Sequence, residues 1–409
     1  MKILFASNLY GEQARGGAEL VVKLEAVGLG QRGYEVAVVS AVPSSLISLS
    51  SKNISAKSST LHVPGMVGRR DEAGVDHFTY FPPNLGYYGD LKQRSWVGRL
   101  IWHWLDIFNW RSANLLRRLI KVYRPKVVHT HNLMGLGFAI PNLLRQLNLR
   151  HVHTVHDVQL IHPSGLLSAD WRLRQLHEWI YLRLMRFMMG SPAVVIFPSE
   201  FALKLHNQFG FFSHSTKTVI RNPAVDQVKD FKSREISNNN FIFVGQLEEH
   251  KGIFDLLTAW QCWSTRDAAT LDIVGDGSLA IEVRSRAAKL EGVRCHGAVY
   301  GEQLTKLLDR AGYLVLPSRV IENAPMAILS AFSRGVPVLA SRVGGIPEIV
   351  RDNENGFLFE SANVDSLLTA LQQAATSKER AVMSQRALSW IRSQSLEAHL
   401  DALESVYRI

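Results

Sequence analysis

Short apolar runs alternate with longer amphipathic stretches along almost the whole chain. The apolar runs of the first half predict strands at Lys2–Ala6, Glu35–Ser40, Val127–Thr130, Val152–Val155 and Ala193–Pro198. Those of the second half predict strands at Phe241–Val244, Thr270–Val274, Val293–His296, Tyr313–Leu316 and Val336–Ala340. Because strands that alternate with helices usually pair in parallel, the pattern predicts an α/β protein with a parallel sheet in each half.

Helical patterns fill the intervals between these strands. We expect a helix at Ala18–Arg32, since this segment follows a Gly-Gly pair and meets Gly33, a residue type that commonly ends helices. The segment Ala113–Tyr123 has apolar residues at helical spacing. The tail Asp365–Ile409 is helix-like throughout.

A boundary between two domains is expected at Val219–Ile236. This segment opens with the turn-like RNPAVD, continues through the charged DFKSRE and precedes the polar run SNNN. We therefore expect one domain over 1–220 and a second over 221–384. With 409 residues, the chain is long enough for two or three domains that each bury a core. Within the first domain, eight serines between Ser44 and Thr60 predict a mobile loop, which in an enzyme could serve an acceptor.

The composition is that of an ordinary globular protein, with 46% hydrophobic and 20% charged residues. Cys262 and Cys295 show neither metal nor disulfide spacing, which favours a reducing compartment. The opening MKILFASNLY has too short an apolar run for a secretory signal. No apolar run approaches the roughly 18 residues that span a membrane. We therefore expect a cytoplasmic protein.

Positive charge is concentrated in the first half. Residues 1–220 contain 25 Lys and Arg against 13 Asp and Glu, a net +12, whereas the remainder is −2 and the whole chain +10. The segment 91–126 alone carries nine basic residues and one acid, Asp106. The same segment contains the aromatic residues Trp96, Trp102, Trp104, Phe108, Trp110 and Tyr123.

Basic and aromatic residues interleaved along a helix suit an anionic membrane surface or a lipid-phosphate acceptor. A protein that binds the inner face of the cytoplasmic membrane peripherally is one interpretation of this segment. The other is a core helix with a solvated arginine face, in which Leu100, Ile101, Leu105 and Ile107 are buried. No nucleic-acid partner is expected, because no binding-module signature accompanies the charge.

The stretch Ser318–Val350 gives the strongest indication of chemistry. Glu322 stands in a short loop after a strand, where its carboxylate could accept hydrogen bonds from sugar hydroxyls. Gly344 and Gly345 follow the next strand, and without Cβ atoms they would let a phosphate approach the backbone near a helix N-terminus. Together these features predict a sugar-nucleotide site.

Two other turns also predict anion binding. Gly16 and Gly17 follow the first strand and open a helix, although the turn is not the G-x-G-x-x-G of a dinucleotide dehydrogenase. In the segment GQLEEHKG, Lys251 follows a strand and precedes a glycine and a helix. An ammonium there could offset charge on a diphosphate leaving group.

Six histidines lie between His129 and His162. His129 and His131 share one face of a strand, as do His151 and His153 on the next. We do not expect a metal site, because the chain has no D-x-D and no carboxylate completes a ligand set. His156 falls on the face opposite His151 and His153, where a loop begins, and its imidazole could hydrogen-bond a sugar hydroxyl.

These motifs together resemble the retaining GT-B glycosyltransferases of family four. The resemblance rests on GGAE, VVHTHN, HTVHD, VIRNPAVD, VGQLEEHKG and the ENAP to GGIPE stretch, which follow one another in the family's order. It implies two Rossmann-like, doubly wound domains that face a cleft. The acceptor would bind the first domain and the nucleotide sugar the second. The segment 385–409 would return to the first domain, with Trp390, Leu400, Leu403 and Tyr407 supplying its packing face.

The resemblance also assigns roles to residues. His156, Lys251 and Glu322 would lie at the reacting atoms. Donor contacts are implied for Gln246, Lys251, Val299, Glu322, Asn323, Ala324, Met326, Ser330, Gly344 and Gly345. Acceptor or phosphate contacts are implied for Gly16, Gly17, Glu19, His131 and Asp157. The chain departs from the family at two of these positions, since Gln246 replaces a common Arg and Ser330 replaces the second Glu of the pattern Glu, seven residues, Glu.

The implied activity is transfer of a sugar from a UDP- or GDP-linked donor to a glycan or lipid-linked acceptor. It would proceed with retention and without a metal or other cofactor, in cell-envelope or exopolysaccharide synthesis. A sugar-nucleotide epimerase on the same fold is an alternative, although the acid and base carboxylates it needs are not evident. A non-catalytic GT-B-like binding partner is the other alternative, and Gln246 and Ser330 favour it.

Overall fold

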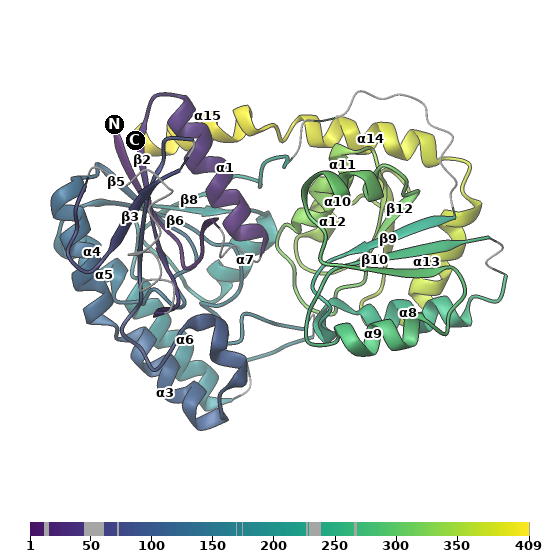
Figure 1. The fold of residues 1–409 in the computed structure, drawn as a ribbon, viewed down its shortest axis with the longest axis horizontal. Coiled ribbons are helices and arrows are strands. Elements are labelled where there is room, and N and C mark those ends of the chain that lie inside the picture. The colour runs from purple at the N-terminus through teal and green to yellow at the C-terminus, as the bar shows by residue number, and fades with distance from the viewer. Residues whose placement is uncertain are drawn as a thin grey trace.

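The computed structural model describes residues 1–11, 16–44, 61–71, 73–168, 170–173, 175–225, 228, 239–265 and 268–408. Apart from Ser44, the predicted serine-rich loop lies outside these residues, as does most of the polar part of the predicted boundary. The chain forms two α/β bodies side by side, each built on its own sheet (Figure 1). The first sheet ends at Val219 and the second begins at Asn240, on either side of the expected division.

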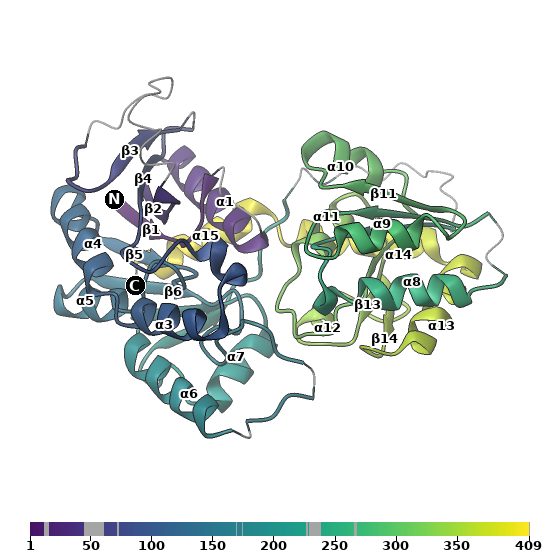
Figure 2. The ribbon, with the colours of Figure 1, turned by 60° about the horizontal axis from the view of Figure 1, so that its bottom comes forward.

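The first sheet has eight strands in the order β3-β4-β2-β1-β5-β6-β7-β8. The predicted strands are present as β1 (Lys2–Ala6), β2 (Glu35–Ala41), β5 (Val127–Thr130), β6 (Arg150–Thr154) and β7 (Val194–Phe197). Three strands were not predicted: β3 (Val67–Arg70), β4 (Asp76–Tyr80) and β8 (Thr216–Val219). The expectation of a wholly parallel sheet is wrong at one edge, because β3 runs antiparallel to β4. Figure 2 shows β3 and α6 (Leu176–Met189) at opposite ends of this body.

The second sheet has six strands, all parallel, in the order β11-β10-β9-β12-β13-β14. Its strands are β9 (Asn240–Val244), β10 (Thr270–Val274), β11 (Val293–Gly297), β12 (Tyr313–Leu316), β13 (Val338–Ser341) and the unpredicted β14 (Gly356–Phe359). The order third-second-first-fourth-fifth-sixth is that of the dinucleotide-binding Rossmann sheet. In such a sheet the order of the strands reverses between the first and the fourth strand. Ligands bind at the carboxyl ends of the strands at that point.

Helices cover both faces of the first sheet. Ile3 and Phe5 of β1 pack toward α1 (Gly17–Gln31) and α15 (Leu396–Arg408). The opposite face packs against α4 (Trp110–Tyr123), α5 (Ile140–Gln146) and α6. Since successive side chains of a strand point to opposite faces, a strand with helices on both sides needs a continuous apolar run. This requirement explains why the buried strands were recognisable in the sequence.

The second sheet is covered in the same way (Figure 1). One face packs against α8 (Ile253–Cys262), α9 (Ala280–Ala287) and α13 (Val364–Thr376). The other face packs against α10 (Gly301–Leu308), α11 (Met326–Ser333), α12 (Ile346–Ile349) and α14 (Arg380–Arg392). Each sheet therefore has an apolar layer on both of its faces.

The last helix crosses back to the first domain, as the fold class predicted. In Figure 1 the yellow chain runs from α14 over the second domain to α15 beside α1. Leu400 packs against Gly28 so closely that a Cβ there would lie 2.6 Å from its Cδ1. Arg32, which follows the last residue of α1, donates to Asp401 at 2.6 Å and to Glu404 at 3.0 Å. Glycine inside α1 is thus explained by the approach of α15.

The crossing begins later than residue 385. Residues 385–392 lie in α14, which packs on α11 of the second domain. Trp390, which was expected to face the first domain, instead makes an edge-to-face contact with Phe332 of α11. Because Ala387, Trp390 and Ile391, near the C-terminal end of α14, still pack in the core that contains α11, the chain leaves the second domain only after the last turn of α14. Leu400, Leu403 and Tyr407 do lie in the core of the first domain, as predicted.

The basic and aromatic segment forms a short 3₁₀ turn, η2 (Tyr88–Gln93), and two helices, α3 (Trp96–Ile107) and α4. Trp102 and Ile107 are buried, but Leu100, Ile101 and Leu105 are exposed, so the alternative of a simple core helix is wrong for these three. Within the described ranges, no helix is both long enough and apolar enough to cross a membrane.

Candidate active site

The two domains enclose a cleft of about 780 Å³ at the carboxyl ends of both sheets. This volume is within the range of ligand pockets, roughly 300–1,000 Å³. The first domain contributes Gly16 and Gly17 after β1, Asn132 after β5, and His156 and Asp157 after β6. The second domain contributes the loops after β9, β10, β11 and β12. The cleft therefore lies at the strand-order reversal of both sheets, where ligands bind in doubly wound folds.

Lys251 and Glu322 form the polar centre of the second-domain wall. Lys251 Nζ donates to Glu322 Oε1 at 2.6 Å, and Ser318 Oγ donates to the same oxygen at 2.8 Å. Both side chains are mostly buried yet line the cleft. In the part of the chain that the structure describes, Glu322 Oε2 has no hydrogen bond and is the oxygen left for a ligand. Lys251 and Glu322 lie where the sequence predicted a diphosphate contact and a sugar contact.

Glycines allow these two loops to lie together. Gly252, with φ +69°, follows the 3₁₀ turn η3 (Glu249–Lys251), and a Cβ there would lie 1.8 Å from the carbonyl oxygen of Pro317. Gly344, with φ +59°, would place a Cβ 2.2 Å from the carbonyl oxygen of Glu322. The N–H of Gly345 donates to that same oxygen at 2.7 Å.

The glycine pair therefore has a different role from the predicted one. Gly344 and Gly345 are not among the residues that line the cleft. They lie behind Glu322, and their backbone fixes the loop that carries it. The N–H that was expected to meet a phosphate is already bonded to Glu322. The sequence correctly indicated a close backbone approach, but the approaching group is the protein's own loop.

The wall of the first domain touches the second domain through a glycine. A Cβ on Gly17 would lie 2.4 Å from Cγ of Met326, the first residue of α11. Gly17 thus lets α1 and α11 come together at the bottom of the cleft. Gly16 precedes the helix as its N-cap residue and lines the cleft. The Gly-Gly pair accordingly serves the contact between the domains as well as the cleft surface.

Hydrogen bonds hold the loops around the cleft together, and several of them run between the first and the second domain. Asn323 Nδ2 donates to the carbonyl oxygen of His156 at 2.9 Å. Asn222 Nδ2 donates to the carbonyl oxygen of Ala324 at 3.2 Å. The N–H of Ile321 donates to the carbonyl oxygen of Leu167 at 2.7 Å. Asn222 and Leu167 were not predicted, although Asn222 belongs to the RNP turn that the sequence placed at the boundary.

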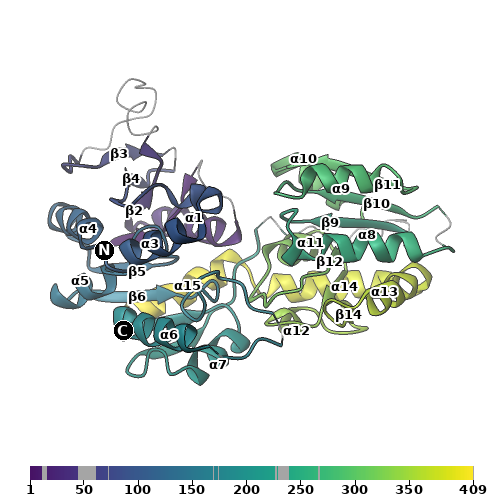
Figure 3. The same ribbon diagram turned by 90° about the horizontal axis from the view of Figure 1, so that it is seen from below.

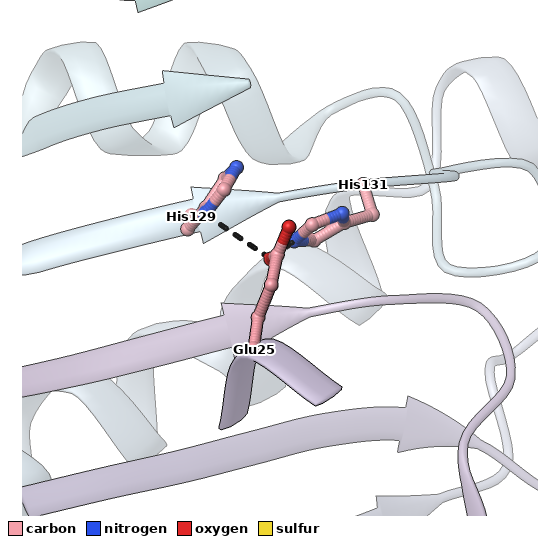
Figure 4. A group of neighbouring side chains, drawn as sticks. All are labelled: Glu25, His129 and His131. Atoms are coloured by element: carbon pink, nitrogen blue, oxygen red, sulfur yellow. Dashed lines mark ion pairs between the residues drawn. The ribbon is translucent and has the colours of Figure 1, made fainter. Parts of the chain in front are cut away.

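Behind the cleft, the histidines of β5 and β6 form a buried network. The hydrogen bonds fall into two groups: His129 pairs with Thr154 at 2.7 Å, and Thr130 pairs with His151 at 2.7 Å and with His153 at 2.8 Å. The expectation that no carboxylate completes a ligand set with these histidines is wrong, because α1 places Glu25 against His129 and His131. Its Oε2 lies 3.5 Å from Nε2 of His131 and 4.0 Å from Nδ1 of His129 (Figure 4). No local pattern pointed to this neighbour, since about one hundred residues separate Glu25 from the histidines.

The family of the chain follows from comparison with known proteins. The family model described as glycosyl transferase 4-like domain matches residues 16–223, and that described as glycosyl transferases group 1 matches 226–390. The two matches cover nearly the whole chain and divide it between the two sheets. The chain belongs to the GT4-type glycosyltransferases.

Individual relatives agree with this assignment. A GDP-mannose-dependent alpha-(1-6)-phosphatidylinositol monomannoside mannosyltransferase of Mycobacterium tuberculosis is 30% identical over 77% of this chain and 92% of its own length. A lipopolysaccharide 1,2-N-acetylglucosaminetransferase of Salmonella typhimurium is 27% identical over 82% of this chain and 86% of its own length. This chain is also similar to the solved structure of Anabaena HepE in complex with UDP. The similarity extends over the full length of both chains, with a TM-score of 0.69 and 16% sequence identity, and it shows a shared GT-B fold.

The cleft of this glycosyltransferase brings together most of the predicted site residues. Its lining includes Gly16, Gly17, His156, Asp157, Gln246, Lys251, Val299, Glu322, Asn323, Ala324 and Met326. Glu19, His131 and Ser330 do not line it. Glu19 and His131 are buried, so the prediction that His131 contacts an acceptor is wrong. Ser330 lies one turn beyond Met326 on α11, and its predicted ribose contact stays a prediction.

Burial controls the charge of the first-domain wall. It lowers the pKa of His156 to about 4, and electrostatic repulsion from the nearby His399 acts in the same direction. Burial raises the pKa of Asp157 to about 7, although a hydrogen bond from the N–H of Gln159 opposes this shift. At neutral pH the glycosyltransferase therefore presents a neutral imidazole to the cleft beside a carboxyl group that is partly protonated.

Proposed function

We propose that this glycosyltransferase transfers a sugar from a UDP- or GDP-linked donor to a glycan or lipid-linked acceptor of the cell envelope. Transfer would proceed with retention of the anomeric configuration and without a metal ion. One observation carries the proposal. A lysine and a carboxylate are paired at the strand-order reversal of the second domain, with a neutral histidine on the opposite wall of the same cleft.

The chemistry requires charge stabilisation at two places. When the bond between the sugar and the diphosphate breaks, negative charge develops on the leaving phosphate and positive charge on the sugar ring. Lys251 would turn from Glu322 to the diphosphate, because the diphosphate carries more negative charge than a single carboxylate. Glu322 would then be free to accept hydrogen bonds from sugar hydroxyls and to orient the ring. His156 would contact the sugar from the acceptor side, and the closed domains would exclude water.

The named activities of the relatives support an envelope acceptor. One relative is named for transfer to lipopolysaccharide and another for transfer to a phosphatidylinositol mannoside. The structure of HepE holds UDP, and a second structure of the same protein holds UDP-glucose. A nucleoside diphosphate of this class would fill the second-domain side of the cleft beside Gln246 and Lys251.

The donor can be identified directly. A thermal-shift screen with UDP, GDP and their hexose and N-acetylhexosamine conjugates should raise the melting temperature for one base only. Turnover of that donor with an envelope glycan should then give a product with the same anomeric configuration as the donor, which NMR reports through the coupling of the anomeric proton. The same reaction in EDTA tests whether turnover needs a metal ion. Inversion would refute the retaining mechanism, and loss of turnover in EDTA would refute metal independence. Absence of binding to every nucleotide would favour the alternative of a non-catalytic partner.

We further propose that the first domain docks on an anionic membrane surface through α3. Trp96 is 68% exposed and Trp104 57% exposed, and Leu100 and Ile101 lie exposed on the same helix. On α6, Phe187 is 75% exposed. Figure 3, the view from below, shows α3 and α6 on the same side of the molecule. Exposed aromatic side chains beside arginines are typical of helices that lie in the membrane interface.

Flotation with lipid vesicles tests the docking surface. The protein should float with vesicles that contain about one third phosphatidylglycerol, and the bound fraction should fall as salt is raised. The double variant Trp96→Ser/Trp104→Ser should lose most of this binding. The matched control Trp263→Phe changes a buried tryptophan of the second domain and should float like the unchanged protein. Binding that is absent or independent of lipid charge would refute the proposal.

A further inference from the structure

Two of the buried polar atoms that lack a hydrogen bond in the described part of the chain lie close to each other. Glu25 Oε2 and His131 Nε2 are both enclosed, and neither has a hydrogen-bond partner in the described part of the chain. They lie 3.5 Å apart. The other ring nitrogen of His131, Nδ1, makes a 2.8 Å hydrogen bond with Nε2 of His156. A continuous line of polar atoms therefore runs from a buried carboxyl group to the histidine that lines the cleft.

The hydrogen bonds of His399 fix the role of Glu25. His399, on α15, places Nδ1 2.9 Å from the carbonyl oxygen of Arg221 and Nε2 3.0 Å from Glu25 Oε1. A carbonyl oxygen only accepts, so Nδ1 of His399 carries a proton. The contact between Nε2 and Oε1 then contains one further proton, on either atom. A further proton on Glu25 Oε2 would leave a buried imidazolium at His399 without a counter-charge, which is costly. Oε2 is therefore the acceptor oxygen of Glu25, and we assign His131 Nε2, 3.5 Å away, as its donor.

A neutral imidazole has one donor nitrogen and one acceptor nitrogen. Burial keeps the pKa of His131 well below its usual value, so its ring carries a single proton at neutral pH. If that proton is on Nε2, then Nδ1 of His131 is an acceptor, and Nε2 of His156 must donate to it. His156 is also neutral, so its own Nδ1 is left without a proton.

We propose that Glu25, acting through His131, holds His156 as the Nε2–H tautomer, so that a bare Nδ1 is presented to the cleft. His156 would then accept a hydrogen bond from a sugar hydroxyl and could not donate one. Glu25 and His131 are positioning residues, because they act through His156 and do not touch the substrate. The role in transfer rests on the proposed function, whereas the tautomer of His156 does not depend on it.

The same cluster does not suit a metal ion. Zinc with ligand bonds of about 2.0–2.1 Å requires ligand atoms roughly 3.4 Å apart in a tetrahedral site. Glu25 Oε2 lies 4.0 Å from Nδ1 of His129. Both ring nitrogens of His129 are already hydrogen-bonded at 2.7 Å, to Tyr407 and Thr154. A metal would have to break these bonds in a closed core, so the geometry favours a hydrogen-bonded relay.

Two substitutions at one position separate the relay from a structural role. Glu25→Gln keeps an acceptor oxygen toward His131, because its amide group can donate to a bare His399 Nε2. Glu25→Leu has a similar volume and no acceptor. With protein labelled with ¹⁵N at its 15 histidines, long-range ¹H–¹⁵N spectra report the tautomer of each ring. The His156 signal is assigned by its loss in His156→Asn.

We expect the Nε2–H tautomer of His156 in the unchanged protein and in Glu25→Gln, and a substantial Nδ1–H population in Glu25→Leu. Turnover should follow, with kcat about tenfold lower in Glu25→Leu and within about twofold in Glu25→Gln. Should Glu25→Leu fail to fold, His131→Asn, which keeps an acceptor oxygen near the position of Nδ1, is compared with His131→Leu in the same way.

Three results would overturn the proposal: an Nδ1–H or doubly protonated His156 in the unchanged protein, an unaltered tautomer in Glu25→Leu, or a stoichiometric metal ion in the purified protein. The spectra do not need a substrate. A protein with the expected tautomers but no transferase activity would refute the proposed function and leave the relay standing.

Discussion

The two sheets share the strand order around their reversal points, but they place polar groups in different layers. In the first sheet, β5 and β6 themselves carry His129, His151 and His153, which are buried and hydrogen-bonded. In the second sheet, the corresponding strands are β12 and β13, which carry neither a histidine nor a charged residue. There the polar groups follow the strands, with Lys251 and Glu322 on loops.

This difference separates two ways of preparing a site. A polar network inside a sheet is costly unless every member is satisfied, and when satisfied it holds a side chain in one orientation. A polar pair on loops can exchange partners when a ligand arrives. In the proposed mechanism, the first domain fixes His156 before any substrate binds, whereas the second domain would hold Lys251 against Glu322 until a diphosphate competes for it.

The largest effect is expected at the loop pair. Lys251→Ala removes the ammonium that would stabilise the leaving diphosphate, and loss of one such group costs about 10²–10³ in kcat. Steady-state kinetics with saturating donor measure the effect. The matched control is Lys306→Ala, an exposed lysine of α10 that pairs with Glu302 on its own helix, and it should leave kcat unchanged.

A second measurement sharpens this prediction. If Lys251 only neutralised Glu322, the double variant Lys251→Ala/Glu322→Gln would recover activity, because neither group would be left charged and unpaired. We expect no recovery, since both residues act on the substrate. Recovery to within a few-fold of the unchanged enzyme would assign the pair a structural role.

The loop residues of the second domain were easier to predict from the sequence than the buried histidine contacts of the first domain. Lys251 and Glu322 follow strands that apolar runs had already located, so their meeting at one sheet edge followed from the parallel order. The contact of Glu25 with His131 joins α1 to β5, and no local pattern encodes it. The loop glycines show the same limit, because Gly344 indicated a close approach without revealing that Glu322 was the approaching group.

The unpredicted strands were missed for physical reasons. β3 and β8 each have at least one edge without a partner strand, and neither has a fully buried residue, so they lack the apolar runs that mark central strands. Trp390 was assigned to the crossing helix because aromatic residues mark a packing face. The sequence did not indicate whether Trp390 would pack against the first or the second domain.

The next largest effect is on stability, and it tests the buried histidines. Burial lowers the pKa of His206, on α7 (Glu200–Gln208), from 6.5 to about 4. As the pH falls below 6.5, the unfolded chain binds a proton at this position that the native domain does not bind. The free energy of unfolding therefore falls between pH 6.5 and 4, by about 2 kcal/mol at pH 5 for this single group.

Denaturant melts followed by circular dichroism at pH 7.5 and pH 5 measure this dependence. His206→Phe should fit among Phe197, Phe211 and Phe212, whose rings surround the imidazole. The loss of stability between the two pH values should be about 2 kcal/mol smaller in this variant. Asp157, whose pKa burial raises to about 7, acts in the opposite direction but is the same in both proteins. An identical pH dependence would show that His206 is protonated in the native state.

A smaller change is expected from restoring a carboxylate on α11. Ser330→Glu places a longer acceptor one turn beyond Met326, where it could reach the ribose of a donor nucleotide. A charged acceptor that meets two hydroxyls is worth about 1.5 kcal/mol, or roughly tenfold in affinity. Titration calorimetry with the nucleotide found in the thermal screen measures it, and Ser330→Gln serves as the uncharged control. Equal affinities in all three proteins would remove Ser330 from the donor site.

The smallest effect is expected where the two halves touch. Gly17→Ala places a Cβ about 2.4 Å from Cγ of Met326, so α1 and α11 must separate slightly or Met326 must change its rotamer. Because methionine is flexible, we expect only about a threefold loss in kcat/KM for the donor. Met326→Ala should restore the activity of Gly17→Ala, since it removes the colliding atoms. If the double variant is no better than Gly17→Ala alone, then the loss arises within the turn itself, and the contact between the fixed half and the adaptable half does not set the geometry of the cleft.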